Sequence, residues 1–505
     1  MHMYLLGLDI GTTGVKAVLI DLQGRVLASG GDTYPLHTPQ PLWAEQNPHD
    51  WWRATVSAIR QVLSESGVAP NQIRGIGLSG QMHGSVFLDE QNRVIRPALL
   101  WCDQRTAEEC VWITERVGQE KVLQTTLNPV LTGFQAGKII WLRRHEPENY
   151  ARIRRVLLPK DHIRFMLTGE YATEVSDASG TALFEVPKRD WAYEILDTLE
   201  LPREWFPRVY ESPEITGRVN ASAAAATGLA EGTPVVGGAG DQAAGAVGTG
   251  IVQRGRVSVS VGTSGVVFAH LDQPRVDPHY RTHTFCHAVP GCWHVMGVML
   301  MAGGALRWYR DTFAQADLYA AHAAGEDPYD RLVKEAEPIP PGAEGLLFLP
   351  YLSGERTPHA DPKARGAFVG ATLAHQRAHF TRAVLEGVAF GLRDSFEILQ
   401  AMGIEIQEVR MTGGGARASL WRQILSDVTG YPLHTLQVEE GPAFGVALLS
   451  GVGIGIWSSV PEACEAVVRL ADRTEPNPRH QEVYERAYTL YRQIYPALRP
   501  LFEQL

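Results

Sequence analysis

Cysteine pairs, long apolar runs and an excess of basic charge are all missing from this sequence. Its five cysteines are scattered, odd in number and without a CxxC pair, so we expect no disulfide framework and a reducing, cytoplasmic compartment. The first residues lack the basic end and the apolar stretch of a secretory signal. The most apolar later stretch, residues 444–457, is too short to span a bilayer. We therefore expect no membrane partner.

Acidic residues outnumber basic residues by 56 to 46, which gives a net charge of −10. This balance lacks the basic footprint of a nucleic-acid-binding protein, so nucleic acid is not an expected partner. A bound anion would have to be held locally, by backbone amides and a few placed cations. The 505 residues, 45 % of them hydrophobic, are enough for about two to four domains with cores of their own.

Two similar segments stand about half a chain length apart. Residues 6–21 and 257–269 each contain a strand pattern, a Gly-Thr-(Thr/Ser)-Gly turn and a second strand pattern, which is typical of a β-hairpin. The repetition predicts a duplicated domain with a boundary near residue 250, that is, domains over residues 1–250 and 251–505. The alternative is that two glycine-rich hairpins coincide by chance.

The two turns have the chemistry of phosphate-binding loops. Glycine lets the backbone approach a ligand, successive amides point into one concavity, and hydroxyl groups add donors. Two facing copies would grip a polyphosphate from both sides. The sequence lacks the spacing of a P-loop, and no GxGxxG motif joins the first strand to a helix. The expected phosphate-binding residues are Gly11, Thr12 and Thr13 in the first turn and Gly262, Thr263 and Ser264 in the second.

Helix and strand patterns alternate along the chain, which predicts an α/β fold. Buried strands are expected over residues 73–78, 94–101 and 234–238, and each of them ends in a polar loop. Ligands of open α/β sheets bind beyond the carboxyl ends of the strands, so these three loops are expected to carry the chemistry.

Two long helices and a third glycine-rich turn are also expected. One helix runs to about residue 66 from Asp50, its predicted N-cap, and another covers residues 377–402. A strand over residues 409–412 leads into the turn 413–417, and this strand-to-helix turn suits a nucleotide group placed against the backbone.

Two aspartates are candidates for chemistry. Asp241 follows a strand among small residues that leave room for a substrate, which suits a base that takes a proton from an alcohol during phosphoryl transfer. A helix N-cap would explain this aspartate equally well. Asp9 stands beside the first turn and could orient a hydrated Mg²⁺ ion, or it could form an Asx-turn of the hairpin.

Other polar residues carry weaker signals. Met82 and His83 follow a strand in a glycine-flanked loop that fits a shaped pocket wall, although a loop histidine is commonly a structural hydrogen-bonding residue. Lys16 follows the first turn and could meet a phosphate, or be an ordinary solvated strand residue. The histidines and cysteines of residues 279–294 include metal-ligand types. They fall on two alternating strands, which argues against a metal site there.

Nearly the whole chain resembles the FGGY family of carbohydrate kinases. The segment from Gly366 to Glu386 is similar to the family's second signature. The other stretches that carry the resemblance are Leu8-Asp9-Ile10-Gly11-Thr12-Thr13, Trp43 to Pro48, Gly80-Gln81-Met82-His83-Gly84, Leu158-Pro159-Lys160-Asp161, Gly240 to Gly245, Phe348 to Pro358 and Gly413 to Arg417.

The resemblance implies two ribonuclease H-like domains of the actin and sugar-kinase superfamily with a cleft between them. It implies ATP and Mg²⁺ in that cleft, sugar bound mainly by the N-terminal domain, ATP by the C-terminal domain, and a homodimer. By position, the family's roles pass to Asp241 as general base, Asp9 near the metal, Met82 and His83 as the sugar loop, Gly262, Thr263 and Ser264 as the second phosphate loop, and Gly414, Gly415 and Ala416 as the adenosine loop.

The expected reaction is phosphorylation of D-xylulose by ATP at O5, with the sugar held by Met82, His83, Asp241 and Gln242. Gln242 stands where many family members with this substrate have Asn, and Cys102 stands where Asn or Gln is usual. Another acceptor of the same family, such as ribulose, a deoxyketose, gluconate or glycerol, is the first alternative. A non-metabolic ATPase of the superfamily, such as a heat-shock chaperone or an actin-like filament protein, is the second.

Overall fold

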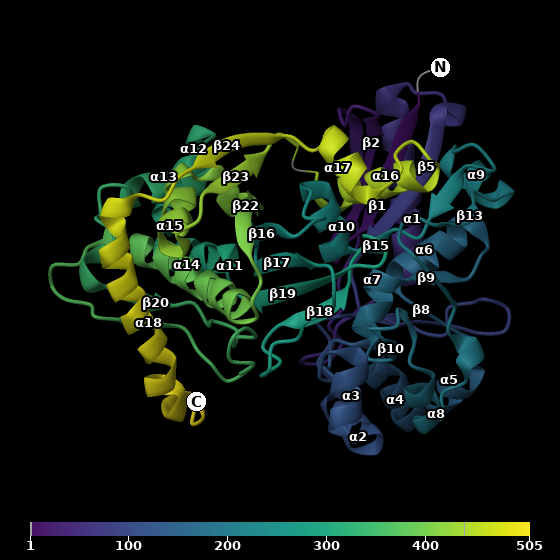
Figure 1. Ribbon diagram of the computed structural model, residues 1–505, viewed down its shortest axis with the longest axis horizontal. Coiled ribbons are helices and arrows are strands. Elements are labelled where there is room, and N and C mark those ends of the chain that lie inside the picture. Colours follow the sequence, from purple (N-terminus) through teal and green to yellow (C-terminus); the bar gives the residue numbers. More distant parts are fainter. Residues whose placement is uncertain (1–2, 439) are drawn as a thin grey trace.

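The computed structural model describes residues 3–438 and 440–505, and Figure 1 shows two halves side by side. The first half contains a seven-stranded sheet in the order β13-β14-β5-β1-β2-β3, with β15 also paired to β5. The bounds of its strands are β1 (Tyr4–Ile10), β2 (Gly14–Asp21), β3 (Val26–Thr33), β5 (Ile73–Gly80), β13 (Ile215–Arg218), β14 (Pro234–Val236) and β15 (Ala239–Gly240).

The second half contains another seven-stranded sheet, in the order β18-β19-β17-β16-β22-β23-β24. The bounds of its strands are β16 (Gly255–Val261), β17 (Gly265–Leu271), β18 (His283–Cys286), β19 (Trp293–Met299), β22 (Ile406–Thr412), β23 (Leu433–Leu436) and β24 (Leu470–Thr474).

The two sheets share one pattern of pairing around their first hairpins. β1 pairs antiparallel with β2 and parallel with β5, and β16 pairs antiparallel with β17 and parallel with β22. The two glycine-threonine turns connect β1 to β2 and β16 to β17, at equivalent positions of the two sheets. The predicted α/β fold of two like domains is therefore confirmed.

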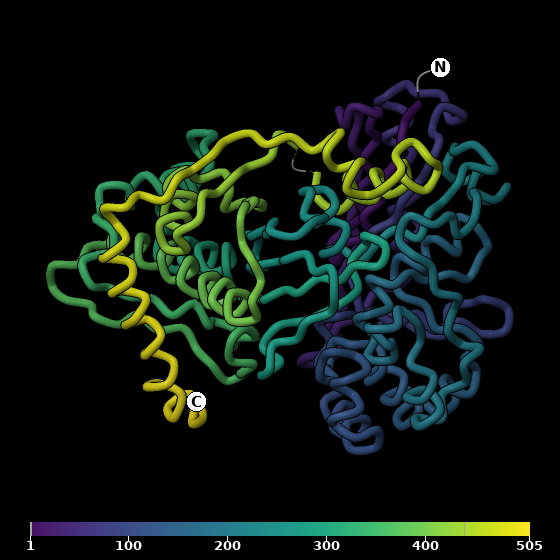
Figure 2. Tube along the Cα trace, viewed as in Figure 1, coloured from purple at the N-terminus to yellow at the C-terminus, as the bar shows by residue number. Residues whose placement is uncertain are grey.

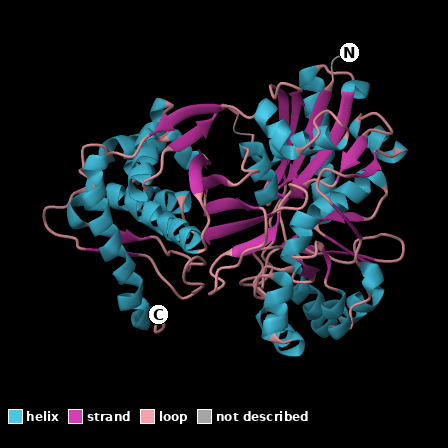
Figure 3. Cartoon of the chain, in the orientation of Figure 1, coloured by secondary structure: helices cyan, strands magenta, loops and turns pink. Residues whose placement is uncertain are grey.

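Helices cover both sheets, as the cyan ribbons of Figure 3 show. In the first half, α1 packs against β2 and β3. In the second half, α14 packs against β17 and β19, and α15 packs against α14. The bounds of these and the neighbouring helices are α1 (Pro48–Ser66), α6 (Pro159–Thr168), α9 (Ala221–Thr227), α11 (Gly303–Phe313), α12 (Gln315–Ala324), α13 (Pro328–Ala336), α14 (Arg377–Ala401), α15 (Ser419–Thr429) and α18 (Gln481–Phe502).

A helical segment interrupts the first half between β5 and β13, and its hydrophobic core also takes in Phe268, Phe285 and Met296 of the second sheet. It lies at the lower right of Figure 1. The bounds of its main helices are α2 (Ala107–Val117), α3 (Gln119–Thr126), α4 (Gln135–His145) and α5 (Pro147–Arg152). The second half has no such insertion at the equivalent position, because only the glycine turn 414–417 and α15 lie between β22 and β23 there.

Two local predictions are wrong. The N-cap of α1 is Asn47, whose side chain accepts a hydrogen bond from the His49 amide (3.1 Å), and Asp50 instead lies in the first turn of the helix. The strand expected over residues 94–101 is reduced to β7 (Ala98–Leu99). Pro97 has no amide hydrogen to donate to a sheet, which shortens the strand on one side.

The two halves are joined by a pair of crossing helices, α10 (Asp241–Thr249) and α16 (Gly441–Gly453). α16 lies directly on the backbone of β1 and β5, because a Cβ atom at Gly7 would stand 1.8 Å from the Ala443 carbonyl oxygen and one at Gly77 2.0 Å from that of Val446. A Cβ atom at Gly445 would stand 1.9 Å from the Ala244 carbonyl oxygen of α10. Glycine at these positions therefore sets the spacing between the two halves.

The chain consequently returns to its first half near its end. Figure 2 shows the yellow segment of α16 and α17 (Val460–Val467) beside the purple strands of the N-terminus. All strands of the first sheet precede residue 250 and all strands of the second follow it, while α16 packs against the first sheet. None of the described helices is both long enough and apolar enough to cross a membrane.

Replacing Gly77 by Ala should destabilise the protein by about 1–3 kcal/mol, because the added methyl group forces α16 away from β5. Urea unfolding at equilibrium measures this loss. The matched control is Gly245→Ala on α10, where a Cβ atom meets only Pro442 at 3.9 Å. We expect the control to be neutral or stabilising by about 0.5–1 kcal/mol, since Ala favours a helix over Gly. Equal unfolding midpoints for the two variants would contradict the proposed spacing role.

Candidate active site

Asp241 is the first residue of α10 and directly follows β15. Gly240 occupies the N-cap position, so Asp241 is not the helix cap, and its carboxylate accepts a hydrogen bond from the Gln242 amide (2.7 Å). Burial, followed by the negative charges of Asp9 and Asp177, raises the pKa of Asp241 to about 7. A carboxylate whose pKa is close to neutrality is suited to take a proton from a hydroxyl group.

Asp9 lies near the end of β1, opposite Ser79 of β5 and Lys16 of β2. Burial raises the pKa of Asp9 to about 6, although Ser79 and the charge of Lys16 act in the other direction. Its Oδ1 atom is buried and has no hydrogen-bond partner among the described residues. Two carboxyl groups with raised pKa values, one of which has an unpartnered oxygen, fit a hydrated divalent cation.

Side chains from three other segments hold the first glycine turn in place. Gln46 donates to the Thr12 carbonyl (2.7 Å), and the Trp101 indole donates to the Thr12 hydroxyl (3.0 Å). The Tyr34 hydroxyl donates to the Gly11 carbonyl. Because these bonds occupy the carbonyl groups and a hydroxyl oxygen, the turn is fixed while Thr13 stays exposed to a ligand.

The second glycine turn is fixed by the start of α11. The Gly303 amide donates to the Gly262 carbonyl (2.7 Å), and the Gly304 amide donates to the Thr263 carbonyl (3.0 Å). A Cβ atom at Gly303 would stand 2.5 Å from the Gly262 carbonyl oxygen, so this contact requires glycine. Thr263 and Ser264 remain exposed.

A cavity of about 590 Å³ lies beside this second turn. Its size and its mixture of aromatic, glycine and charged groups suit a nucleoside. The residues of the predicted adenosine loop lie at its wall, except for Ala416, which is buried behind it. The residues that line this cavity include Gly262, Thr263, Gly303, Tyr329, Asp330, Gly414, Gly415, Arg417 and Trp421.

A second cavity of about 340 Å³ connects this region with Asp241. Both cavities are lined by Gly414 and Arg417, and the second also reaches Asp241 and Gln242 at the start of α10. A nucleotide with its base in the larger cavity would therefore direct its phosphates toward Asp241. The structure brings together the second phosphate turn, the adenosine loop and the predicted base along one path.

The predicted sugar loop lies next to Asp241. A Cβ atom at Gly240 would stand 2.9 Å from Cγ of Met82, so the Met82 side chain packs on the backbone just before Asp241. The Nδ1 atom of His83 lies 2.7 Å from the Gly180 carbonyl oxygen, which can only accept, so Nδ1 carries the hydrogen. Burial lowers the pKa of His83 to about 3 and leaves its Nε2 atom free to accept a hydrogen bond from a sugar hydroxyl.

Lys138 is a site residue that the sequence did not reveal. It is fully buried on α4, and its ammonium group donates to the carbonyl groups of His83 (2.8 Å) and Gly133 (2.6 Å). Burial lowers the pKa of Lys138 to about 7, although the nearby Asp103 and Cys102 act in the opposite direction. Cys102 therefore belongs to the surroundings of the sugar loop. A single lysine in a helical pattern is normally a surface residue, so no sequence signal identified it.

A buried ionic network supports the segment that carries Asp241. The ammonium group of Lys160 lies 3.0 Å from Asp161, 3.2 Å from Glu174 and 2.9 Å from Asp177. Glu174 accepts a hydrogen bond from the Ser176 hydroxyl (2.9 Å), whose oxygen accepts one from the Gly240 amide (3.0 Å). The network therefore fixes the backbone directly before Asp241 and adds negative charge near it.

Lys16 and the polar loop after residue 101 make contacts that stabilise the fold. Lys16 pairs with Glu440 (2.5 Å), directly before α16, and so links the first sheet to the crossing helix. Asp103 is buried, accepts from the Ala44 amide (2.7 Å) and pairs with Arg105 (2.7 Å). Three polar loops were expected to carry chemistry. The loop that contains His83 lies next to the loop that contains Asp241, whereas the loop after residue 101 forms mainly an ion pair between Asp103 and Arg105.

The fold and these cavities define a two-domain kinase of the actin and sugar-kinase superfamily. The family model for the N-terminal domain of FGGY carbohydrate kinases matches residues 4–248. The family model for the C-terminal domain matches residues 257–454. The chain belongs to the FGGY family of carbohydrate kinases.

Named relatives are similar over nearly the whole chain. The chain is 41 % identical to a xylulose kinase of Escherichia coli, over 99 % of this chain and 100 % of that one. The crystal structure of a xylulose kinase from Rhodospirillum rubrum superposes with a TM-score of 0.90 at 32 % identity, over 99 % and 100 % of the two chains. A gluconate kinase from Lactobacillus acidophilus superposes with a TM-score of 0.91 at 26 % identity, over 99 % and 98 %.

The raised pKa of Asp241 predicts a pH-dependent stability difference between the unliganded wild type and the variant Asp241→Asn. Between the unfolded value of 3.8 and the folded value of about 7, the folded carboxyl binds a proton that the unfolded chain releases, so rising pH destabilises the wild type. The variant lacks this penalty. We expect its unfolding midpoint in urea to exceed that of the wild type at pH 8, and the difference to shrink by pH 5. A pH-independent difference would contradict the raised pKa.

Proposed function

We propose that this chain is a xylulose kinase that transfers the γ-phosphoryl group of ATP to O5 of D-xylulose, in the catabolism of xylose. The observation that carries the proposal is the position of Asp241 and the Met82–His83 loop at the inner end of a path that starts at the nucleoside-sized cavity. Similarity to xylulose kinases over nearly the full length supports the choice of sugar.

The sugar binds first, against the loop of the N-terminal domain. The free Nε2 atom of His83 accepts a hydrogen bond from one sugar hydroxyl, and Met82 packs against the carbon skeleton. Gln242 offers an amide at the start of α10, beside Asp241. The Lys138 ammonium holds the His83 carbonyl and so keeps the loop in one conformation. O5 is then within reach of the Asp241 carboxylate.

The phosphates of ATP lie between the two glycine turns. Backbone amides and the hydroxyl groups of Thr12, Thr13, Thr263 and Ser264 surround the transferring group and stabilise its negative charge. Asp241 accepts the proton of O5 as this oxygen attacks the γ-phosphorus atom in line with the leaving ADP. The two turns belong to opposite halves of the molecule, so their approach would also exclude water from the reaction.

Asp9 is the residue that would hold Mg²⁺, through water. The unpartnered Oδ1 atom of Asp9 and the high pKa values of both carboxyl groups fit such an ion. Bound there, it would neutralise phosphate charge and lower the pKa of both carboxyl groups.

We further propose domains over residues 1–250 and 251–505, a homodimer and a cytoplasmic location. All five cysteines are free, which agrees with a reducing compartment that contains ATP. The dimer and the compartment are tested by light scattering and by fractionation of cells.

Replacing Asp241 by Asn should lower the turnover of D-xylulose by about 10²–10⁴-fold, because the amide cannot accept the O5 proton. ADP release coupled to a second enzyme measures turnover. The variant should still bind ATP, since Asp241 does not line the nucleoside-sized cavity. Turnover within a few-fold of the wild type would refute the assignment of the base.

A panel of D-xylulose, D-ribulose, L-ribulose, gluconate, glycerol and no sugar tests the substrate. We expect strong ATP turnover with D-xylulose and little without an acceptor. Preference for another polyol would keep the kinase and its base but reject the proposed sugar. Equal turnover across the panel, with no phosphorylated product, would reject the kinase and favour a non-metabolic ATPase. The variant Gln242→Asn is the matched test of specificity, and we expect it to change KM for the sugar more than kcat.

A further inference from the structure

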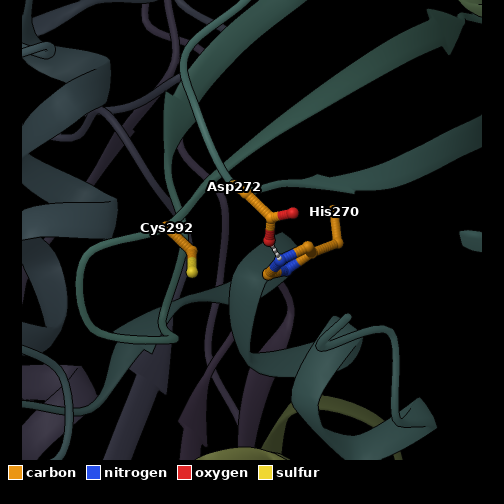
Figure 4. Close-up of side chains that lie close together, drawn as sticks. All are labelled: His270, Asp272 and Cys292. Carbon is orange, nitrogen blue, oxygen red and sulfur yellow. Dashed lines mark hydrogen bonds and ion pairs between the residues drawn. The ribbon is translucent and has the colours of Figure 1, made fainter. Parts of the chain in front are cut away.

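A second cluster of chemically active side chains lies at the end of the second sheet that is remote from the phosphate turn. It consists of His270 on β17, Asp272 just after β17, and Cys292 just before β19 (Figure 4). β17 runs from the phosphate turn to His270 over six residues, which places the cluster about 20 Å from that turn. The proposed kinase mechanism does not use these three residues.

The three side chains have the geometry of a ligand set. One nitrogen of His270, one carboxylate oxygen of Asp272 and the sulfur of Cys292 all lie within 4.8 Å of one another. The His270 Nε2 atom is 3.0 Å from Oδ1 of Asp272. Ligand atoms around one tetrahedral ion, at about 2.0–2.3 Å from it, stand roughly 3–4 Å apart. Small side-chain rotations would therefore bring all three atoms onto a single ion.

The sheet fixes the positions of these residues. In the register of β17 and β19, Leu271 pairs with Trp293, so Asp272 and Cys292 continue the same ladder on opposite strands. His270 is only 4 % exposed, and its Nδ1 atom is buried without a hydrogen-bond partner among the described residues. The Asp272 side chain is exposed and borders a cavity of about 290 Å³, which gives an ion a route from solvent.

Neighbouring groups leave the site open to a cation. Arg189 lies close to Cys292, but its guanidinium is paired with Glu211 through two hydrogen bonds of 2.7 Å. His287 uses both ring nitrogens, toward the Ile251 carbonyl (2.9 Å) and the Val289 amide (3.2 Å), and is therefore not a ligand. His294, opposite His270 in the ladder, is fully buried and both of its nitrogens lack partners among the described residues.

We propose that His270, Asp272 and Cys292 bind one Zn²⁺ ion, with a water molecule as fourth ligand. Nitrogen, thiolate and carboxylate together are a typical zinc donor set, whereas Mg²⁺ and Ca²⁺ require mostly oxygen ligands. The stretch 279–294, weighed as a metal site from its composition, contributes only Cys292, and the other two ligands come from the end of the preceding strand.

The ion would fasten the end of β17 to the start of β19, next to the contact between the two halves. In that contact the Trp293 indole donates to the Val186 carbonyl (2.9 Å), and Arg189 donates to the Cys292 carbonyl (2.5 Å). The proposed ion thus links two strands, and its site is independent of the proposed sugar kinase activity.

Titration of the chelator-treated, nucleotide-free protein with Co²⁺ tests the site. We expect one equivalent of Co²⁺ to give a thiolate-to-metal charge-transfer absorption, and one equivalent of Zn²⁺ to displace it and raise the melting temperature. The variant Cys292→Ser should lose the absorption and the rise in melting temperature. The control Cys102→Ser, which removes another half-buried thiol, should keep both.

The proposal is overturned if the wild type shows no thiolate absorption, or if Cys292→Ser keeps it. It is also overturned if Asp272→Asn, a conservative change at an exposed residue, leaves the affinity for Zn²⁺ within two-fold of the wild type. Because no nucleotide or sugar is present, neither result depends on the kinase site. Kinase activity measured on the same variants separates the two proposals.

Discussion

The contact of α16 with the bare backbone of β1 and β5 is the constraint on which the rest of the structure depends. Gly7 and Gly77 are paired neighbours in the first sheet, and a side chain at either would displace the helix. The same helix packs on α10 through Gly445, so one stack of backbone contacts fixes the crossing pair. Asp241 is the first residue of α10, and its position relative to Asp9 on β1 therefore depends on these glycine contacts.

Burial at this junction also raises the pKa values of the two carboxyl groups in the site. Asp9 and Asp241 are carboxylates without a full complement of hydrogen-bond donors, and each is disfavoured in its charged form. The cation of Lys160 does not relieve them, because its three carboxylate partners, Asp161, Glu174 and Asp177, already surround it. The folded protein thus keeps a pair of high-pKa carboxyl groups, which is unfavourable for stability and useful for proton transfer beside phosphate. A cation bound there is the natural counter-charge.

The sequence predicted what is local and repeated. The two hairpins, α14, and the glycine turn after β22 could be located because each depends on residues adjacent in the chain. The strand expected over 94–101 failed because an apolar run resembles a strand unless Pro97 is weighed against it. Lys138 and the crossing helices escaped detection for another reason. Their roles are set by contacts with residues distant in the chain, and a lone lysine or glycine carries no pattern that indicates such a contact.

What could be predicted from the sequence depends on whether a proposed role belongs to a repeated backbone turn or to single side chains. In the proposed mechanism, phosphate is bound by two copies of one backbone turn, and a repeated turn leaves a repeated glycine signal in the sequence. In the same proposal, the sugar is bound by the side chains of Met82 and His83. Their loop is held by Lys138 of α4, in an insertion that the second half lacks. Such contacts occur once and leave no repeated segment in the sequence. A xylulose kinase and a gluconate kinase superpose on this chain equally well, so the shared fold accounts for phosphoryl transfer and not for the choice of sugar. We therefore propose that sugar specificity depends on the side chains around Asp241, with Gln242 and the surroundings of Cys102 among them.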